Sequence, residues 1–160
     1  MLLEKSSVDQ HTGLLNKHYI DNYRTDMEAK RIVLLFMDID DFKSINDIYG
    51  HLTGDAIIKS VADCIKDELC NCSKGIRFGG DEFVVIFENV QKDQVYETAE
   101  RIRKRVNALD FSKLYGDLKV CVSIGLVEGT SSVKELIAEA DKAMYNSKSR
   151  GKNRTTVFAH

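Results

Sequence analysis

The segment best suited to chemistry is Arg77-Phe78-Gly79-Gly80-Asp81-Glu82-Phe83, in which two glycines precede two carboxylates. Apolar residues on both sides predict two strands, 76–78 and 83–87, joined by a tight hairpin turn. The glycines should tolerate a positive φ in that turn, and without Cβ atoms they would let a bulky ligand lie against the backbone. A turn needs only the glycines, so the carboxylates of Asp81 and Glu82 indicate a site for a divalent cation.

A second acidic segment, Asp38-Ile39-Asp40, directly follows the apolar run 32–37. Such a run is typical of a strand buried on both faces, and ligands of α/β sheets usually bind at the carboxyl ends of strands. If the hairpin lies beside this strand, Asp38 and Asp81 converge on one hard cation, for which Mg²⁺ is the best candidate. The alternative is that these acids are solvated strand ends, and the presence of two such acidic segments argues against it.

Between the two acidic segments, Asn46 and Asp55 are candidates for binding a guanine base. An amide offers a donor and an acceptor, and a carboxylate accepts the two donors of the guanine edge. Asn46 is equally suited to end a helix and Asp55 to begin one, and spacing alone favours this structural explanation.

A basic segment near the C-terminus could clamp phosphates or complement a helix dipole. Its cations are Lys142, Lys148, Arg150, Lys152 and Arg154.

The elements that would position these side chains alternate between helix and strand. Apolar spacing predicts helices over 14–29, 41–47, 53–69, 95–109 and 133–144. Ala56, Ile57, Val61, Ile65 and Leu69 should form the buried face of the third helix. Strands are expected over 118–126 and 155–158, in addition to those named above. The sequence therefore predicts a single α/β (α+β) sandwich, with a mainly antiparallel central sheet flanked by helices.

Composition fits one soluble domain: 160 residues, 43% of them hydrophobic and 30% charged, with a net charge of −2. This charge argues against generic affinity for nucleic acid or anionic membranes. Neither a membrane span nor a signal peptide is expected. The cysteines, Cys64, Cys70, Cys72 and Cys121, favour a reducing cytoplasmic setting, and the spacing Cys70-Asn71-Cys72 is too short for a zinc knuckle.

Four segments resemble, in the same order, the motifs of the GGDEF domain, the catalytic domain of diguanylate cyclases. Residues 9–17 resemble D-x-L-T-G-L-x-N-R, with His11 and Lys17 as departures. Residues 38–55 resemble D-x-D-x-F-K-x-x-N-D-x-x-G-H-x-x-G-D without a gap, and residues 79–83 are the signature itself. Residues 140–154 resemble A-D-x-A-L-Y-x-A-K-x-x-G-R-N-R. The resemblance implies a domain over 9–160 with the fold of nucleotide cyclases and polymerase palms, preceded over 1–8 by the end of a connecting helix.

The resemblance further implies condensation of two GTP molecules into cyclic di-GMP and two pyrophosphates. Mg²⁺, with Mn²⁺ as an alternative, would be held by Asp38, Asp81, Glu82 and the carbonyl of Ile39, and the two residues Asp81 and Glu82 would act in catalysis. The implied substrate-binding residues are Asn46, Asp55 and His51 at the base, and Lys43, Gly79, Gly80, Lys148 and Lys152 at the phosphates.

Because each 3′-hydroxyl must attack the α-phosphate held by the other domain, a homodimer is expected. The resemblance also implies an upstream sensor domain in the full-length protein. This domain would lie in the cytoplasm, even if the sensor anchors the protein to a membrane. It would contact neither nucleic acid nor the membrane. The family's inhibitory R-x-x-D motif would fall at Cys70 and Ser73, so product inhibition through it is expected to be absent. Asp55 implies a preference for GTP over ATP. The alternatives are a catalytically idle GGDEF-like module that binds GTP or a protein, and a nucleotide cyclase with another product.

Overall fold

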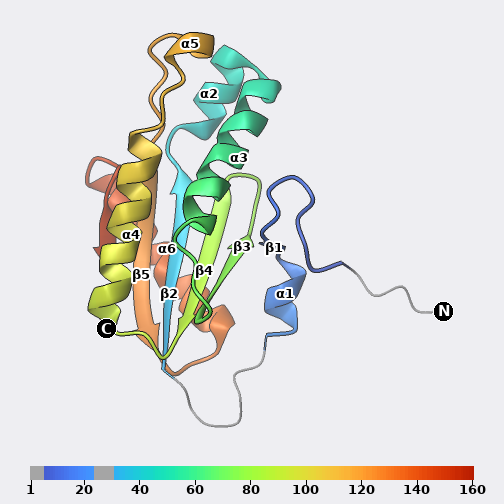
Figure 1. Cartoon of the computed structure of the whole chain (residues 1–160). Coiled ribbons are helices and arrows are strands. Elements are labelled where there is room, and N and C mark those ends of the chain that lie inside the picture. Colours follow the sequence, from blue (N-terminus) through green and yellow to red (C-terminus); the bar gives the residue numbers. More distant parts are fainter. Residues whose placement is uncertain (1–5, 24–30) are drawn as a thin grey trace, which may run out of the picture.

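The computed structural model describes residues 6–23 and 31–160. Within these residues, a sheet of six strands in the order β1-β3-β4-β2-β5-β6 carries helices on both faces (Figure 1). The strands are β1 Leu15–Asn16, β2 Ile32–Ile39, β3 Ser73–Arg77, β4 Glu82–Glu88, β5 Val122–Gly129 and β6 Thr155–Val157. The helices are α1 His18–Asp21, α2 Phe42–Tyr49, α3 His51–Lys66, α4 Lys92–Asn107, α5 Ser112–Tyr115 and α6 Val133–Ser149.

The sheet is mainly antiparallel, as the sequence predicted. The pairs β3–β4, β4–β2 and β2–β5 are antiparallel, and only the edge pairs β1–β3 and β5–β6 are parallel. No helix among the described residues is long and apolar enough to cross a membrane.

Strand β2 is central because both of its faces are apolar, as predicted from the run 32–37. Val33, Leu35 and Met37 belong to the core under α3 and α4, whereas Leu34 and Phe36 belong to the core under α6. Figure 1 shows α3 and α4 in front of the sheet and α6 behind it. Each fully buried aliphatic side chain contributes roughly 1.5–3 kcal/mol, so this strand is rigidly held and its carboxyl end has a fixed position.

The long helices bury the apolar faces that their spacing predicted. In α4, Val95, Ala99, Ile102 and Val106 are all buried. In α3 the buried face includes Ile57, Val61 and Ile65, but Ala56, which was expected there, is exposed. Ile58 is buried instead, because the face that packs on the sheet is rotated by part of a turn.

The prediction of a helix over 14–29 is wrong for its first residues. Leu15 pairs in parallel with Ile76 in β1, and α1 begins only at His18. The Asn16 side chain explains part of the difference, since its amide donates to the carbonyl of Ser6 at 2.7 Å and its oxygen accepts from the His18 N–H at 3.0 Å. The part of the predicted helix over 24–30 lies outside the described residues, as do residues 1–5 of the expected connecting helix.

The turn between β3 and β4 lies one residue earlier than predicted, over 78–81 rather than 79–82. Residues 78–81 connect Arg77 to Glu82, and neither Gly79 nor Gly80 has a positive φ. The backbone is stabilised instead by the Glu82 carbonyl, which accepts from the N–H groups of Phe78 at 2.8 Å and Gly79 at 3.2 Å. The glycines are therefore not required by the backbone angles of the turn.

Three further features differ from the sequence analysis. The four-residue helix α5 was not predicted, because so short a segment has no measurable period. The strand predicted over 118–126 begins only at Val122, as β5. Leu118 and Val120 are buried but do not pair in the sheet. Cys70 and Cys72 form a disulfide rather than remaining reduced, whereas Cys64 and Cys121 are free thiols.

Candidate functional site

The carboxyl end of β2 lies directly beside the glycine turn that connects β3 to β4. In the sheet register, Asp38 is opposite Glu82 on β4 and opposite Ser123 on β5. The Ile39 N–H donates to the Asp81 carbonyl at 3.2 Å. Because antiparallel pairing fixes this register, the two acidic segments of the sequence lie at the same end of the sheet.

Asp38 is held in a position where its negative charge is unfavourable. Burial, and next the neighbouring Asp81 carboxyl, raise the pKa of Asp38 to about 7, against the opposing effect of the Lys148 ammonium at 3.4 Å. The Asp38 Oδ1 atom is buried and has no hydrogen-bond partner among the described residues. Two close carboxyls and a buried unpaired oxygen are what a divalent cation would satisfy.

Glu82 explains why position 79 is a glycine. A Cβ atom on Gly79 would lie 2.2 Å from Glu82 Oε1, so the glycine leaves space for this carboxylate. Burial and the charge of Asp81 raise the pKa of Glu82. Position 80 is different, because a Cβ atom on Gly80 would have no atom within 4 Å. The turn thus offers an open approach at Gly80 and a fixed carboxylate beside it.

These groups fit a magnesium ion better than a metal held by protein side chains alone. In the ranges 6–23 and 31–160, no three His, Cys, Asp or Glu side chains form a chelating cluster. A cation near Asp38 and Asp81 would therefore complete its shell with other oxygens, such as the Ile39 carbonyl, water and substrate phosphates. Mg²⁺ has this preference.

A second buried oxygen lies between α2 and α3. Asn46 Oδ1 has no hydrogen-bond partner in the described part of the chain. A Cβ atom on Gly54 would lie only 1.8 Å from it, so glycine at position 54 allows the Asn46 side chain to sit against α3. Asp55 follows in the first turns of α3 with an exposed side chain. An orphaned amide oxygen and a free carboxylate on adjacent helices can bind the edge of a base.

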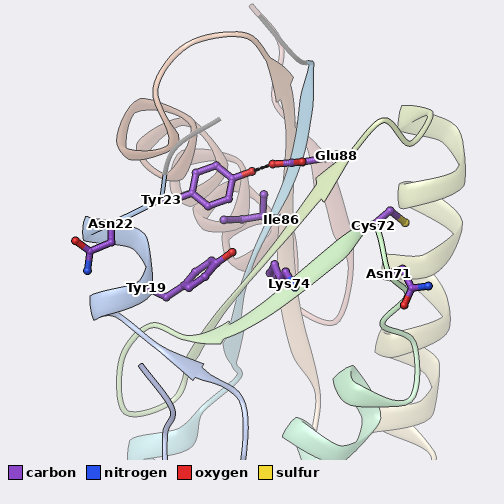
Figure 2. A pocket seen from close by; sticks show the side chains of 8 residues that line it. All are labelled: Tyr19, Asn22, Tyr23, Asn71, Cys72, Lys74, Ile86 and Glu88. Carbon is purple, nitrogen blue, oxygen red and sulfur yellow. Dashed lines mark hydrogen bonds between the residues drawn. The ribbon is translucent and has the colours of Figure 1, made fainter. Parts of the chain in front are cut away.

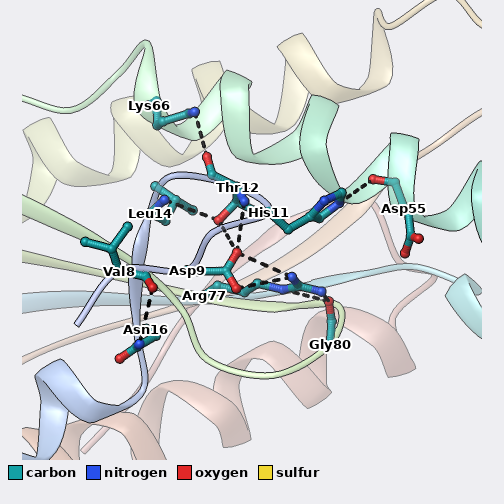
Figure 3. Close-up of polar contacts among 10 residues, drawn as sticks. All are labelled: Val8, Asp9, His11, Thr12, Leu14, Asn16, Asp55, Lys66, Arg77 and Gly80. Atoms are coloured by element: carbon teal, nitrogen blue, oxygen red, sulfur yellow. Dashed lines mark hydrogen bonds and ion pairs between the residues drawn. The ribbon is translucent and has the colours of Figure 1, made fainter. Parts of the chain in front are cut away.

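Residues 9–14 form a turn, called the N-terminal turn below, that lies beside this region (Figure 3). The His11 ring lies with Nε2 2.9 Å from the Asp55 carbonyl, so it contacts the backbone of α3. His11 is one of the departures from the family motif noted above. The side chains of Lys43 and His51 are exposed on the same two helices.

Arg77 joins the N-terminal turn to the glycine turn, as Figure 3 shows. Its Nη2 donates to the Gly80 carbonyl at 2.8 Å and its Nη1 to Asp9 Oδ2 at 3.4 Å. Asp9 also accepts from the Thr12 N–H at 2.9 Å. Although burial opposes the change, the Thr12 hydrogen bonds and the Arg77 guanidinium lower the pKa of Asp9. The Asp9 carboxylate thus anchors one side of the glycine turn.

The opposite side of the site is organised by Asp40, which is buried. Ser123 Oγ donates to Asp40 Oδ1 at 2.6 Å, and the Asn153 N–H donates to Oδ2 at 3.1 Å. Lys148 Nζ is shared between Asp38, at 3.4 Å, and Asp40, at 3.5 Å. Asp40 therefore fixes both the lysine and the basic segment that follows α6.

Comparisons with known proteins agree with this arrangement. The family model described as "Diguanylate cyclase, GGDEF domain" matches residues 6–154. The chain belongs to the GGDEF family. The fold is that of this family: the GGDEF domain of DgcB from Caulobacter crescentus, in complex with c-di-GMP, matches with a TM-score of 0.88 and 32% identity over 98% of both chains.

Curated relatives of this GGDEF domain are longer than the chain itself. Diguanylate cyclase A of Treponema denticola is 36% identical over 98% of this chain but only 45% of its own length. Diguanylate cyclase DosC of Escherichia coli is 34% identical over 94% of this chain and 35% of its own length. The chain therefore spans less than half the length of these two relatives.

The expected site residues of this GGDEF domain fall into two groups. Asp38, Ile39, Asp81, Glu82 and Lys148 surround the end of β2, whereas Asn46, Asp55, His51 and Lys43 lie on α2 and α3. Gly79 and Gly80 lie in the turn beside the first group, and Lys152 pairs its Nζ with Asp41 at 2.5 Å, where β2 ends and α2 begins.

Sequence reasoning assigned no role to Asp9, Arg77 or Asp40. The first and third of these residues are fixed positions of the family motifs, so the motifs contained a signal for them. Their partners could not be read from the sequence, because Asp9 and Arg77 are 68 residues apart and Asp40 and Asn153 are 113 residues apart.

Proposed function

We propose that this GGDEF domain is a diguanylate cyclase, which condenses two GTP molecules into cyclic di-GMP and releases two pyrophosphates. The observation that carries the proposal is the pair of buried oxygens without partners, Asp38 Oδ1 at the end of β2 and Asn46 Oδ1 between α2 and α3. One requires a cation and the other a donor, and a magnesium complex of GTP supplies both. Four matched family motifs, none of which has lost an acidic residue, support an active enzyme.

Asp38, Asp81 and the Ile39 carbonyl would hold Mg²⁺, or Mn²⁺ in its place, and Glu82 would support the same metal cluster. When bound, the metal neutralises charge on the triphosphate and lowers the pKa of the attacking 3′-hydroxyl. In this account Asp38 and Asp81 are catalytic in their ionised form. In the proposed mechanism Asp81 would also accept the proton of the 3′-hydroxyl, with Glu82 orienting the same cluster.

The base would be bound between α2 and α3. The Asp55 carboxylate accepts from guanine N1–H and N2–H₂, while Asn46 contributes its amide, with His51 nearby. Adenine lacks the two adjacent donors, so Asp55 favours GTP over ATP.

The phosphates would lie along the glycine turn and the lysines. Gly79 and Gly80 would allow the substrate to approach the backbone, and Lys148 already lies beside Asp38 and Asp40. Lys43 is exposed on α2, and Lys152 can reach phosphate only after leaving Asp41. Lysine at 152 keeps the charge of the family's arginine but loses its two-pronged geometry, which weakens phosphate binding.

One domain cannot close the ring, because each bound GTP attacks the GTP of another domain. A homodimer, at least a transient one, is therefore part of the proposed mechanism, and an upstream sensor in a longer protein would control it. The reaction would take place in the cytoplasm. Cys70 and Ser73 replace the charged residues of the family's inhibitory motif, so we propose that product does not inhibit through this turn.

The test is to incubate the protein with Mg²⁺ and GTP and to identify the products by mass. Wild type and Asp93→Asn, whose carboxylate is exposed at the start of α4, should form cyclic di-GMP and pyrophosphate. Asp81→Asn should bind GTP but form product at least about 100-fold more slowly. Bound GTP without product in the wild-type protein would show a binding module and contradict the proposal.

A further inference from the structure

The turn between α3 and β3 carries the disulfide between Cys70 and Cys72. The two Cα atoms are 5.3 Å apart, and Cys70, Asn71 and Cys72 are all exposed. Cys64, in contrast, is buried in α3, and Cys121 is half-buried before β5. Exposed disulfides are the ones that exchange readily with thiols in solution.

The backbone of this turn is fixed by hydrogen bonds that do not involve the sulfur–sulfur bond. Ser73 Oγ accepts from the Cys70 N–H at 2.8 Å, and the Ser73 N–H donates to the Cys70 carbonyl at 3.1 Å. The Glu88 N–H of β4 donates to the Cys72 carbonyl at 2.9 Å. Because these bonds do not depend on the disulfide, they should keep the backbone of the two cysteines in place after it opens, so that it can close again.

A hydroxyl group and a lysine lie beside the two sulfur atoms. The Ser73 hydroxyl lies 3.5 Å from Cys70 Sγ, and Lys74 lines the surface hollows beside both cysteines. The acids that end α3 are already paired, Asp67 with Arg105 at 2.6 Å and Glu68 with Arg101 at 3.1 Å. Cations and hydroxyl donors stabilise the thiolate, which is the reactive form of cysteine.

The sulfur atoms are also accessible. Cys72 lines a pocket of about 380 Å³ together with Tyr19, Tyr23, Lys74 and Glu88. Figure 2 shows these side chains, with Cys72 at the edge of the group. In this view the Cys72 sulfur points away from the two tyrosines. A small thiol or disulfide can therefore reach it without any rearrangement of the sheet.

We propose that Cys70 and Cys72 form a reversible thiol–disulfide exchange site for small thiols and disulfides of the glutathione class. In the oxidation, one cysteine thiolate attacks glutathione disulfide, which gives a mixed disulfide and one glutathione thiolate. The second cysteine thiolate then attacks the protein sulfur of the mixed disulfide and expels the second glutathione. The protein loses two electrons and two protons, and glutathione disulfide is reduced to two glutathione molecules.

Cys64 and Cys121 provide an internal comparison. Burial raises the pKa of both thiols, so they carry less thiolate than an exposed cysteine at the same pH. Under the same oxidant they should react more slowly than the pair in the turn.

The experiment equilibrates the folded protein with reduced and oxidised glutathione, blocks free thiols and analyses tryptic peptides by mass. Cleavage after Lys66 and Lys74 isolates Cys70 and Cys72 in the peptide 67–74, apart from Cys64 and Cys121. As the oxidised fraction of the buffer rises, the peptide with two blocked thiols should be replaced by the disulfide form, which is two hydrogens lighter than the unblocked dithiol. At a fixed ratio of the two glutathione forms, halving their total concentration should raise the disulfide-to-dithiol ratio about twofold, because two glutathione molecules are released per bond.

The matched control is Cys70→Ser, which leaves Cys72 without a partner. It should accumulate glutathione on Cys72, in a ratio that does not change when total glutathione is halved. The proposal fails if the wild-type peptide keeps both thiols at the most oxidising ratio, if it carries glutathione instead of the internal bond, or if Cys70→Ser takes up no glutathione. None of these readouts depends on cyclase activity, so the result stands apart from the proposed function.

Discussion

At the scale of single residues, the most informative features are atoms that lack partners and glycines that provide space. Asp38 Oδ1 and Asn46 Oδ1 are buried without hydrogen bonds in the described chain, and Gly79 and Gly54 provide the space that Glu82 and Asn46 occupy. A protein selected only for stability would satisfy such oxygens or place them in water. Their arrangement is explained if a ligand completes it.

Gly54→Ala should therefore damage substrate binding more than stability. The added methyl group would displace the Asn46 amide, which the glycine Cβ position approaches to 1.8 Å. We expect KM for GTP to rise about tenfold, equivalent to ~1.4 kcal/mol. The melting temperature should change little, because alanine suits a helix better than glycine and this offsets part of the strain. Lys59→Ala, at an exposed position of α3, serves as the control. Equal KM values in the two variants would contradict the assignment of Asn46.

Asp38→Asn should stabilise the protein when no metal is present. The pKa of Asp38 in the folded protein, about 7, lies above its ordinary value of 3.8. Between these two pH values the folded protein therefore binds a proton at Asp38 that the unfolded chain has released. Stability of the wild type should then fall as pH rises from about 4 to 7, a slope that the asparagine variant loses.

At pH 8 in EDTA, Asp38→Asn should be more stable than the wild type by about 1–2 kcal/mol. This free energy is smaller than the whole pKa shift of Asp38 implies, because solvent partly screens the carboxyl group. Urea unfolding at pH 5 and pH 8 measures the difference. Adding Mg²⁺ should stabilise the wild type and leave Asp38→Asn unchanged. Parallel pH profiles for the two proteins would show that Asp38 is not under electrostatic strain.

At the scale of elements, the site depends on contacts between segments that are distant in the sequence. Arg77 holds the Gly80 carbonyl at 2.8 Å and contacts Asp9, so the N-terminal turn and the β3–β4 turn form one unit. Asp40 connects β2 to the segment after α6 in the same way. Asp40 is buried and Asp9 is half-buried, and both carboxylates accept several hydrogen bonds, which makes their positions more rigid than those of surface ion pairs.

Arg77→Lys should lower kcat about tenfold with little change in KM, because lysine keeps the charge but cannot hold Gly80 and Asp9 together. Asp9→Asn should have a similar effect. A double-mutant cycle should give a coupling energy of about 1 kcal/mol. The control is Arg101→Lys, which changes contacts with Glu68 and Thr98 between α3 and α4, away from the glycine turn. Additive effects of the two changes would contradict the role of Arg77 as a positioning residue.

At the scale of the whole molecule, the sequence predicted the sheet and its long helices where periodicity was strong. The run 32–37 and the spacing of Val95, Ala99, Ile102 and Val106 depend on burial alone, and both predictions were confirmed. The segment around Leu15 could not be predicted, since a side-chain hydrogen bond and pairing with Ile76 decide its conformation. The proximity of Asp38 and Asp81 was expected, whereas the partners of Asp9 and Asp40 depend on tertiary contacts.

The proposed reaction also makes a prediction about the molecule as a pair. Because two domains must meet, the rate of cyclic di-GMP formation per domain should rise in proportion to protein concentration until dimers dominate. Initial rates over a hundredfold range of concentration, with Mg²⁺ and saturating GTP, measure this. A specific rate that is constant from the lowest concentration would require a dimer that is already stable there, which sedimentation at the same concentration would detect. A constant specific rate from monomers would contradict the mechanism.

In the proposed mechanism, Asp38 and Asp81 share a metal ion beneath the triphosphate, and every later step depends on this metal. A crystal structure of the protein with Mn²⁺ and a non-hydrolysable GTP analogue, with the metal located by its anomalous scattering, tests this directly. We predict a manganese ion in contact with both carboxylates and with phosphate oxygens, and the base beside Asn46 and Asp55. Metal bound away from Asp38 and Asp81 while the analogue occupies the site would contradict the account.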